Sequence, residues 1–340
     1  AGRDFARTRR RFPAHRLQPS SCVLPAVTIL LATNCEVERR REPESLRTSH
    51  ATIGGRPETG SRRWAGVPSY TAGHFGLEGT AMSEREQTIS AVVVPTLGTR
   101  PEFLAECVTS IRAAGSCHLV LVRPSQCSID PSVAALVDDE IDDPGRGLAA
   151  AINVGMAALP DTVLYATWLG DDDRLTADSL TTAAAAMERE SAVFVFGGCR
   201  YIDAAGRELW LNASGRWAVP LMRMGPQLIP QPGSLFDRRV FDAIGGLDES
   251  WKWAFDLDLF LRLAQRGRMS FVDSTLAEFR WHDGSLSVGG RKGSVTEASK
   301  IRRRYLPRLL RPLSFLWEPL LRRVILLAGE RMNRRLHRAG

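Results

Sequence analysis

The segment Tyr165–Leu175, YATWLGDDDRL, constrains this chain most, because an apolar run ends abruptly in three consecutive aspartates. We interpret the run as a strand that delivers Asp171, Asp172 and Asp173 to its carboxyl end, where α/β sheets bind ligands. Carboxylate oxygens at this density suit Mg²⁺ or Mn²⁺, and such an ion commonly takes substrate phosphates as further ligands. The competing interpretation is an acidic turn that caps the next helix, because aspartate is favoured at helix N-termini.

Strands and helices are expected to alternate along the chain after Met82. Short apolar runs typical of buried strands are separated by segments with the apolar spacing of helices. The expected strands are 89–94, 118–122, 162–169 and 192–196, and the expected helices are 101–114, 147–159 and 176–190. This alternation predicts an α/β fold with a mostly parallel sheet flanked by helices. The three aspartates are then expected at the edge of the sheet where ligands bind.

The composition divides the chain into three regions. No methionine precedes Met82, and this part is lysine-free and rich in Arg, Pro, Ser, Thr and Gly, a composition that cannot bury a core. We therefore interpret 1–82 as a disordered or non-native extension, 83–290 as the α/β domain, and 291–340 as a basic amphipathic helical tail. The apolar segment Cys22–Thr33 superficially resembles a signal peptide, but it is too short to span a bilayer.

The charge distribution and the cysteines exclude several classes of function. The formal net charge of +7 comes from the N-terminal extension and from the segment after Ile301, while the stretch between them is net acidic. That stretch lacks the interleaved basic and aromatic residues of a nucleic-acid surface, so no nucleic-acid partner is expected. The six cysteines show no CxxC spacing, and a single adjacent histidine, His118 beside Cys117, does not complete a metal-ligand pattern. Neither a zinc site nor a disulfide framework is indicated, and a reducing compartment fits best.

A second candidate site lies in 231–267, where a loop, a helix, a Gly-Gly turn and another helix are expected in order. Asp256 and Asp258 fall two residues apart in the second helix, so they cannot share one face and only one is expected to face a cleft. The alternative is structural: Asp256 caps the helix, and Asp258 is solvated or pairs with Arg262 four residues later.

Seven motifs follow one another between Ile89 and Ser287. In order they read VVVPT, GLAAAINVG, WLGDDD, QPGSLF, RRVFDAIGGLDES, FDLDLFLRLAQRG and RWHDGSLS. Each motif is weak alone, but their co-linear order resembles the family 2 glycosyltransferases of the GT-A fold. The resemblance implies a sheet of the nucleotide-diphospho-sugar transferase type and an inverting enzyme of the hexosyltransferase type.

The resemblance also implies roles for the acidic residues. Asp171 and Asp173 match the outer positions of the family's DxD motif, with Asp172 between them, and would hold Mn²⁺ or Mg²⁺ on the diphosphate of a nucleotide-sugar donor. His282 matches a histidine often seen near the metal or the diphosphate; the alternative is a structural histidine. Asp256 matches the catalytic aspartate, which would act as general base on the acceptor hydroxyl.

Other positions carry over from the resemblance to the two substrates. The residues expected to border the nucleotide are Pro95, Thr96, Arg100, Arg146, Gly147 and Asn153. The residues expected on the acceptor side are Gln231, Pro232 and Gly233. Three positions depart from the family pattern: Arg123 stands where relatives read the base, Ile152 where they often have arginine, and Phe255 where they have glutamate. The donor base therefore stays open among UDP, GDP and dTDP.

The tail after Ile301 mixes arginine clusters with Leu, Phe and Trp, without an uninterrupted apolar span. One interpretation is a helix that lies on an anionic membrane surface; the other is a helix packed on the domain or in a dimer interface. We expect a cytoplasmic enzyme, peripheral on the inner face of the membrane in the first case, that acts on a cell-surface glycan or a lipid-linked acceptor. The alternatives are a catalytically silent nucleotide-sugar-binding or recruitment protein on the same fold and a sugar nucleotidyltransferase, although the latter's Gly-rich triphosphate loop is missing.

Overall fold

The computed structural model describes residues 89–282 and 290–339, and all of them belong to one compact unit. The predicted extension at 1–82, with Cys22 and Cys35, lies outside the described residues. The same holds for the end of the RWHDGSLS motif after His282.

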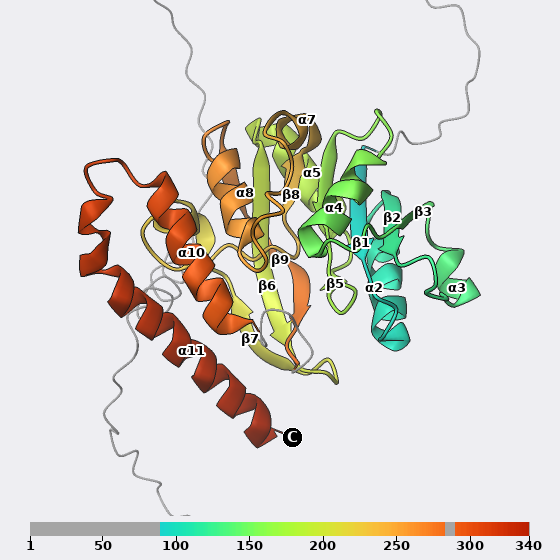
Figure 1. The fold of residues 1–340 in the computed structure, drawn as a ribbon. Helices are drawn as coiled ribbons and strands as arrows, with labels where there is room; N and C mark the ends of the chain where they lie inside the picture. The colour runs from blue at the N-terminus through green and yellow to red at the C-terminus, as the bar shows by residue number, and fades with distance from the viewer. Residues whose placement is uncertain (1–88, 283–289, 340) are drawn as a thin grey trace, which may run out of the picture. The chain divides into compact units, whose positions relative to one another are not determined.

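The first half of the domain is a parallel sheet with helical crossovers (Figure 1). Its strands are β1 (Ser90–Pro95), β2 (His118–Arg123), β3 (Asp139–Asp142) and β4 (Tyr165–Trp168), and its helices are α2 (Pro101–Ala114), α3 (Pro131–Ala134) and α4 (Leu148–Ala157). Helix α2 has the predicted bounds, because Pro101 occupies its first turn and Gly115, with a φ of 139°, follows its last residue. Strand β4 is shorter than predicted and ends just before the aspartates.

The second half adds antiparallel pairings to the sheet. Its strands are β5 (Arg174–Leu175), β6 (Phe194–Ile202), β7 (Glu208–Asn212), β8 (Leu235–Asp237) and β9 (Met269–Arg280). Its helices are α5 (Ser179–Glu190), α6 (Ala218–Leu221), α7 (Arg238–Ala243) and α8 (Phe255–Leu263), with a 3₁₀ turn η2 at Gly215–Trp217. The strand order is β3-β2-β1-β4-β8-β6-β9-β5, with β7 paired to β6. The predicted GT-A type α/β sheet is confirmed; it is parallel from β3 to β4, and β8 introduces antiparallel neighbours on both its sides.

Both faces of the sheet are buried at its central strands, as the continuous apolar run of β1 requires. Alternate residues of β1 enter different cores: Ala91 and Val93 pack with α4 and α8 on one face, and Val92 and Val94 pack with α2 and α5 on the other. The buried face of α8 contains Leu257, Phe260 and Leu261, as its apolar stripe predicts. This packing fixes the start of α8 beside the carboxyl end of β4.

The C-terminal segment forms two long helices, α10 (Arg291–Tyr305) and α11 (Glu318–Ala339), joined through a 3₁₀ turn η3 at Pro312–Leu316. Helix α10 packs on α8: Ile301 is fully buried in the same core, and the Tyr305 hydroxyl donates to Asp258 over 2.9 Å. Helix α11 packs on α10. Among the helices in the described part of the chain, none has the length and apolarity needed to cross a bilayer.

Candidate active site

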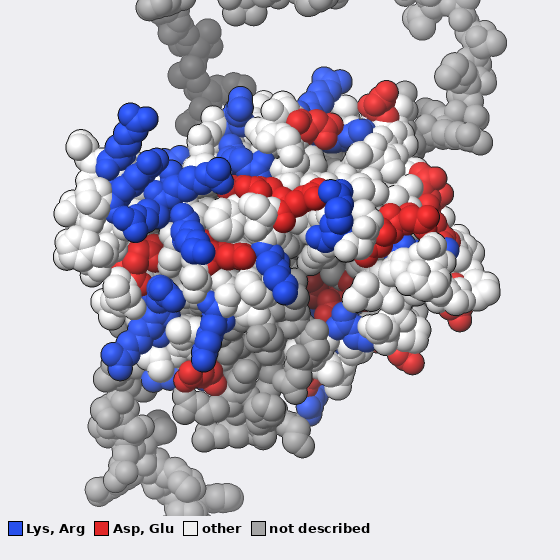
Figure 2. Space-filling view, in the orientation of Figure 1, with Lys and Arg blue, Asp and Glu red and all other residues white. Residues whose placement is uncertain are grey.

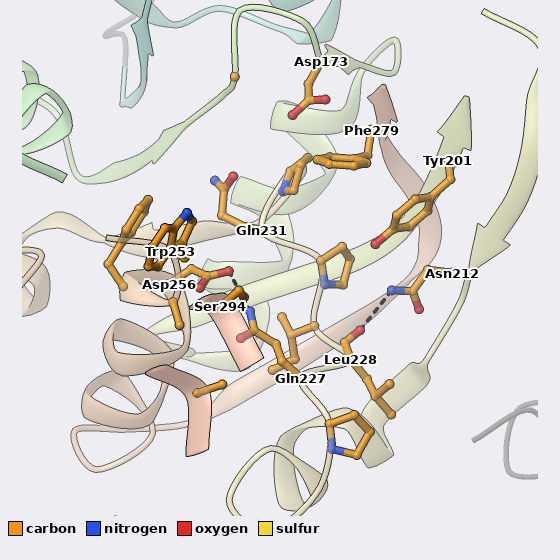
Figure 3. A pocket seen from close by; sticks show the side chains of 18 of the residues that line it. Asp173, Tyr201, Asn212, Gln227, Leu228, Gln231, Trp253, Asp256, Phe279 and Ser294 are labelled. Atoms are coloured by element: carbon orange, nitrogen blue, oxygen red, sulfur yellow. Dashed lines mark hydrogen bonds between the residues drawn. The ribbon is translucent and has the colours of Figure 1, made fainter. Parts of the chain in front are cut away.

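A cavity of about 380 Å³ lies beyond the carboxyl ends of β1 and β4. The β4–β5 connection contributes Asp172 and Asp173 to its wall, α8 contributes Asp256, and α10 contributes Ser294. Figure 3 shows Asp173 beside Phe279 at one end of the cavity and Asp256 beside Trp253 and Gln227 at another. The two predicted sites, more than 80 residues apart in the sequence, therefore share one cavity.

Asp171, Asp172 and Asp173, the acidic cluster, are held by partners from several elements. The Thr96 hydroxyl donates to Asp171 Oδ2 over 2.6 Å. The guanidinium of Arg100 bridges two carboxylates, with Nη2 2.9 Å from Asp171 Oδ1 and Nη1 3.1 Å from Asp172 Oδ2. A cation from the loop after β1 thus balances part of the charge at the end of β4.

Asp173 is the most enclosed member of the acidic cluster, with 4% of its surface exposed. Its Oδ1 accepts the backbone N–H of Arg280 over 2.9 Å, and Arg280 Nε donates to the Asp172 carbonyl over 2.9 Å. Burial, reinforced by the neighbouring Asp172 charge, raises the pKa of the Asp173 carboxyl well above its ordinary value. Burial likewise raises the pKa of Asp171. A cation placed among these carboxylates would favour their ionised forms.

The carboxylates of the acidic cluster and the nearby imidazole are groups that can bind a divalent ion, but in this structure they pair with one another and with Arg100. His282 Nε2 lies 2.8 Å from Asp172 Oδ2 and 3.0 Å from Arg100 Nη1, so the predicted histidine joins the acidic cluster. Within 89–282 and 290–339, no three side chains of the His, Cys, Asp or Glu type are arranged to hold a metal. Carboxylate and imidazole groups are nonetheless ligands that Mn²⁺ accepts. Arg100 occupies the carboxylate oxygens that such an ion would need.

Asp256 sits in the first turn of α8 with its carboxylate toward the cavity. Its Oδ2 accepts from Gln227 Nε2 over 2.8 Å, and its Oδ1 accepts from the Leu257 N–H over 2.7 Å. Burial raises the pKa of Asp256, while these two hydrogen bonds act in the opposite direction. Asp258 points away from the cavity, is 1% exposed and pairs with Arg262 over 2.7 Å. The two aspartates therefore separate as the helical spacing predicts.

Helix α10 fixes the start of α8 through Glu297, a residue that sequence reasoning missed. Its carboxylate accepts the backbone N–H groups of Lys252, Trp253 and Ala254 at 3.1, 2.8 and 3.1 Å. These donors directly precede α8, where N–H groups lack helical partners. No local pattern marks Glu297, because its partners lie more than 40 residues earlier in the chain.

The residues predicted to border the nucleotide divide into two groups. Pro95 lines the cavity, and Thr96 and Arg100 contact the acidic cluster. Arg146 is largely exposed and pairs with Glu249 over 3.2 Å. The Asn153 side chain exchanges hydrogen bonds of 2.9 Å with the backbone of Leu247. Gly147, with a φ of 104°, precedes α4. Arg146, Gly147 and Asn153 are not among the residues that line the cavity.

On the predicted acceptor side, Gln231 and Pro232 line the cavity. Gln231 Nε2 donates to the Trp168 carbonyl over 2.7 Å, which ties this loop to the end of β4. Gly233 is buried with a φ of 76°, and a Cβ there would lie 2.8 Å from Leu276 Cβ. Gly233 therefore lets the loop approach β9, while Gln231 and Pro232 face the cavity.

Two of the positions that depart from the family pattern belong to the core. Ile152 is fully buried, and Phe255 is 5% exposed, with its ring 6.2 Å from that of Trp168. Arg123 instead pairs with Glu140 at the end of β2.

Aromatic side chains form a wall of the cavity that the sequence interpretation did not include. The rings of Tyr201 and Phe279 lie 5.1 Å apart, and Trp281 is 6.1 Å from Phe279. All three line the cavity. The alternation Phe279-x-Trp281 on one strand face is a signal that could have identified them, because residues two apart share a face.

The sequence and the fold are each similar to those of known proteins. Residues 91–241 match the sequence profile of Glycosyl transferase family 2. No curated protein matches the chain by sequence. Among solved structures, S. aureus TarS 1-349 aligns with 15% identity and a TM-score of 0.48, covering 68% of this chain and 71% of that chain. The complex of the same protein with UDP-GlcNAc aligns with 14% identity and a TM-score of 0.48, covering 64% and 66%. Residues 91–241, which contain the acidic cluster, therefore form a region of the Glycosyl transferase family 2 type.

Proposed function

We propose that this glycosyltransferase moves a hexose from a nucleoside-diphosphate donor to a hydroxyl of a glycan or lipid-linked acceptor, with inversion at the anomeric carbon. One observation carries the proposal: Asp172 and Asp173 of the acidic cluster line the same cavity as Asp256. The donor diphosphate would lie at the acidic cluster and the acceptor hydroxyl at Asp256. The products would be a cell-surface polysaccharide or a related glycan.

Asp256 is the proposed general base. Its carboxylate faces the cavity, and Gln227 fixes its orientation through a 2.8 Å hydrogen bond. The raised pKa of Asp256 brings its basicity closer to that needed to accept a proton from a hydroxyl under attack. Glu297 positions this residue indirectly, because it holds the backbone from which α8 starts.

Asp171, Asp173 and His282 are the proposed ligands of a divalent ion, Mn²⁺ or Mg²⁺. When bound, such an ion supplies Lewis-acid stabilisation of the charge on the departing nucleoside diphosphate. Arg100 would leave Asp171 and remain available to a phosphate oxygen, for which a guanidinium is well suited. Pro95, Thr96, Arg146, Gly147, Asn153 and Asp172 remain the residues proposed to border the nucleotide.

Gln231, Pro232 and Gly233 form the proposed acceptor side, with Tyr201 and Phe279 as stacking surfaces for a sugar ring. We place the enzyme in the cytoplasm, with residues 291–340 at the inner face of the membrane. This location would bring the cavity close to a lipid-linked acceptor.

Nucleotide release from a panel of UDP-, GDP- and dTDP-hexoses tests the function. The protein should release nucleotide from one donor in the presence of Mn²⁺ or Mg²⁺, and Asp173→Ala and Asp256→Asn should each abolish release. Asp256→Asn should still bind the donor, since it leaves the acidic cluster intact. Donor binding without turnover in the unsubstituted protein would refute the transferase and favour the silent binding protein.

A further inference from the structure

A second hollow lies between α10 and α11, separate from the candidate active site. This α10–α11 groove has a volume of about 700 Å³. Basic side chains line it together with apolar ones: Lys300, Arg303, Arg322 and Arg323 with Phe315, Leu326 and Leu327. Figure 2 shows that Lys and Arg side chains gather over this part of the molecule. Cations beside apolar side chains in one open groove suit a ligand with an anionic head and an apolar body.

Among the described residues that line the groove, basic side chains outnumber acidic ones. Two acidic residues, Glu318 and Glu330, also line the groove. The Glu318 carboxylate pairs with the buried Arg302 over 2.9 Å and accepts the Ser299 hydroxyl over 2.6 Å. In the described ranges, Lys300, Arg303 and Arg323 form no ion pair with any acidic side chain. Four cations thus line the groove with two carboxylates, of which Glu318 is already paired, and this excess of positive charge favours an anionic ligand.

Apolar side chains beside the groove are exposed to an unusual extent. Phe315, which lines the groove, is 66% exposed, and Leu316 and Leu320, which directly follow lining residues in the sequence, are 65% and 66% exposed. One face of α11 carries both leucine and arginine, because residues three or four apart lie on the same side of a helix. These residues are Leu320, Arg323 and Leu327. Exposed clusters of large apolar residues mark interaction surfaces rather than ordinary solvent-facing ones.

We propose that the α10–α11 groove and its exposed apolar rim form a docking surface for an anionic phospholipid membrane. Arginine and lysine would contact headgroup phosphates, while Phe315, Leu316 and Leu320 would enter the boundary between headgroups and acyl chains. A soluble phosphate would satisfy the cations only. The apolar rim therefore favours the lipid surface over a free anion.

The groove and the candidate active site are lined by different residues of the same two helices. Arg302 and Ile325 line the active-site cavity, while their neighbours Arg303 and Leu326 line the groove. A membrane bound at the groove would thus contact residues of α10 and α11 that the sugar-transfer cavity does not use. This inference rests on the proposed peripheral location, but it does not depend on the transfer reaction.

Sedimentation with vesicles, without any donor sugar, tests the proposal on the full chain. The protein should bind vesicles of phosphatidylcholine and phosphatidylglycerol in equal parts, remain in solution with phosphatidylcholine alone, and not be released by inorganic phosphate. The triple variant Lys300→Ala, Arg303→Ala and Arg323→Ala should bind about 100-fold more weakly, because each cation near an anionic surface contributes about fivefold.

Matched control variants distinguish the effect of these particular residues from the effect of losing positive charge or exposed apolar side chains anywhere on the protein. The triple variant Arg223→Ala, Arg239→Ala and Arg266→Ala removes three exposed cations elsewhere and should bind like the unsubstituted protein. Leu316→Ser with Leu320→Ser should weaken binding, whereas Leu211→Ser with Met224→Ser, also exposed, should not. Equal losses in test and control variants, release by inorganic phosphate, or failure to sediment with anionic vesicles would overturn the proposal. A transferase that is inactive but still sediments would refute only the proposed function.

Discussion

Replacement of Gln227 by methionine should move the acidic limb of the pH–rate profile without abolishing activity. Gln227 Nε2 donates to Asp256 Oδ2 over 2.8 Å and so stabilises the ionised carboxylate. Methionine has a similar length but no donor, so the variant should raise the pKa of Asp256. A hydrogen bond to a charged group contributes about 1.5–3 kcal/mol, and about 1.4 kcal/mol corresponds to one pKa unit. Because Asp256 is only partly buried, we take the lower end of that range. The expected shift is about one pH unit.

The sign of the shift follows from the role of the base. Asp256 accepts a proton only when it is ionised, so activity should rise as the pH increases through its pKa. A higher pKa in Gln227→Met should therefore move this limb toward higher pH. On the alkaline side of the limb, where Asp256 is ionised in both proteins, the two profiles should approach each other.

The assay is kcat/KM for nucleotide release as a function of pH, which reports ionisations of the free enzyme and the free substrate. Gln231→Met is the matched control: Gln231 lines the same cavity, but its amide donates to the Trp168 carbonyl. The control should change the rate without moving the limb. An unmoved limb in Gln227→Met, or an equal movement in Gln231→Met, would refute Asp256 as the titrating base.

Three further substitutions test other contacts. Glu297→Ala should lower the free energy of unfolding by about 2 kcal/mol, because three backbone N–H groups before α8 lose a charged acceptor. Denaturant titration should show a smaller loss for Glu297→Gln, which keeps a neutral acceptor. Equal losses in the two variants would contradict the argument that the charge of Glu297 matters. Arg302→Leu should lower the free energy of unfolding by about 3 kcal/mol, since Glu318 loses its buried partner. The double variant Arg302→Leu with Glu318→Leu should recover part of that free energy in the same titration. Arg100→Ala should strengthen Mn²⁺ binding in calorimetry by freeing carboxylates of the acidic cluster. Arg207→Ala, which removes a largely exposed side chain paired with Asp203, should leave Mn²⁺ binding unchanged. Weaker Mn²⁺ binding in Arg100→Ala would show that the arginine does not compete with the ion.

Sequence patterns predicted best the elements whose ends are locally encoded. Helix α2 begins at Pro101 and ends before Gly115, as predicted. Strand β6 was predicted too short, because Gly197 and Gly198 weaken a strand pattern. In the fold Gly197 is needed for close packing, since a Cβ there would lie 2.5 Å from Leu276 Cγ of β9. Strand β8 was missed because three residues are too few to establish a period.

The same distinction applies to the candidate site. The acidic cluster and Asp256 stand out because each combines charge with an apolar run in one segment. Their shared cavity depends on the antiparallel insertion of β8 beside β4, which sequence reasoning did not include. The pairing of Arg100 with Asp171 joins residues 71 positions apart, and Glu297 acts on N–H groups of a distant segment. Such contacts have no signature in a single sequence.

Helices α10 and α11 line both the active-site cavity and the groove, so substrate binding in the cavity and membrane binding at the groove can be coupled. Helix α10 contributes Ser294, Val295 and Ala298 to the active-site cavity, and α11 contributes Ile325. If membrane docking changes how these helices sit, the affinity for donor or acceptor changes by some factor. Reciprocity then requires the occupied enzyme to hold the membrane more or less tightly by the same factor. The change in membrane affinity on substrate binding and the change in substrate affinity on membrane binding would then report the same coupling free energy.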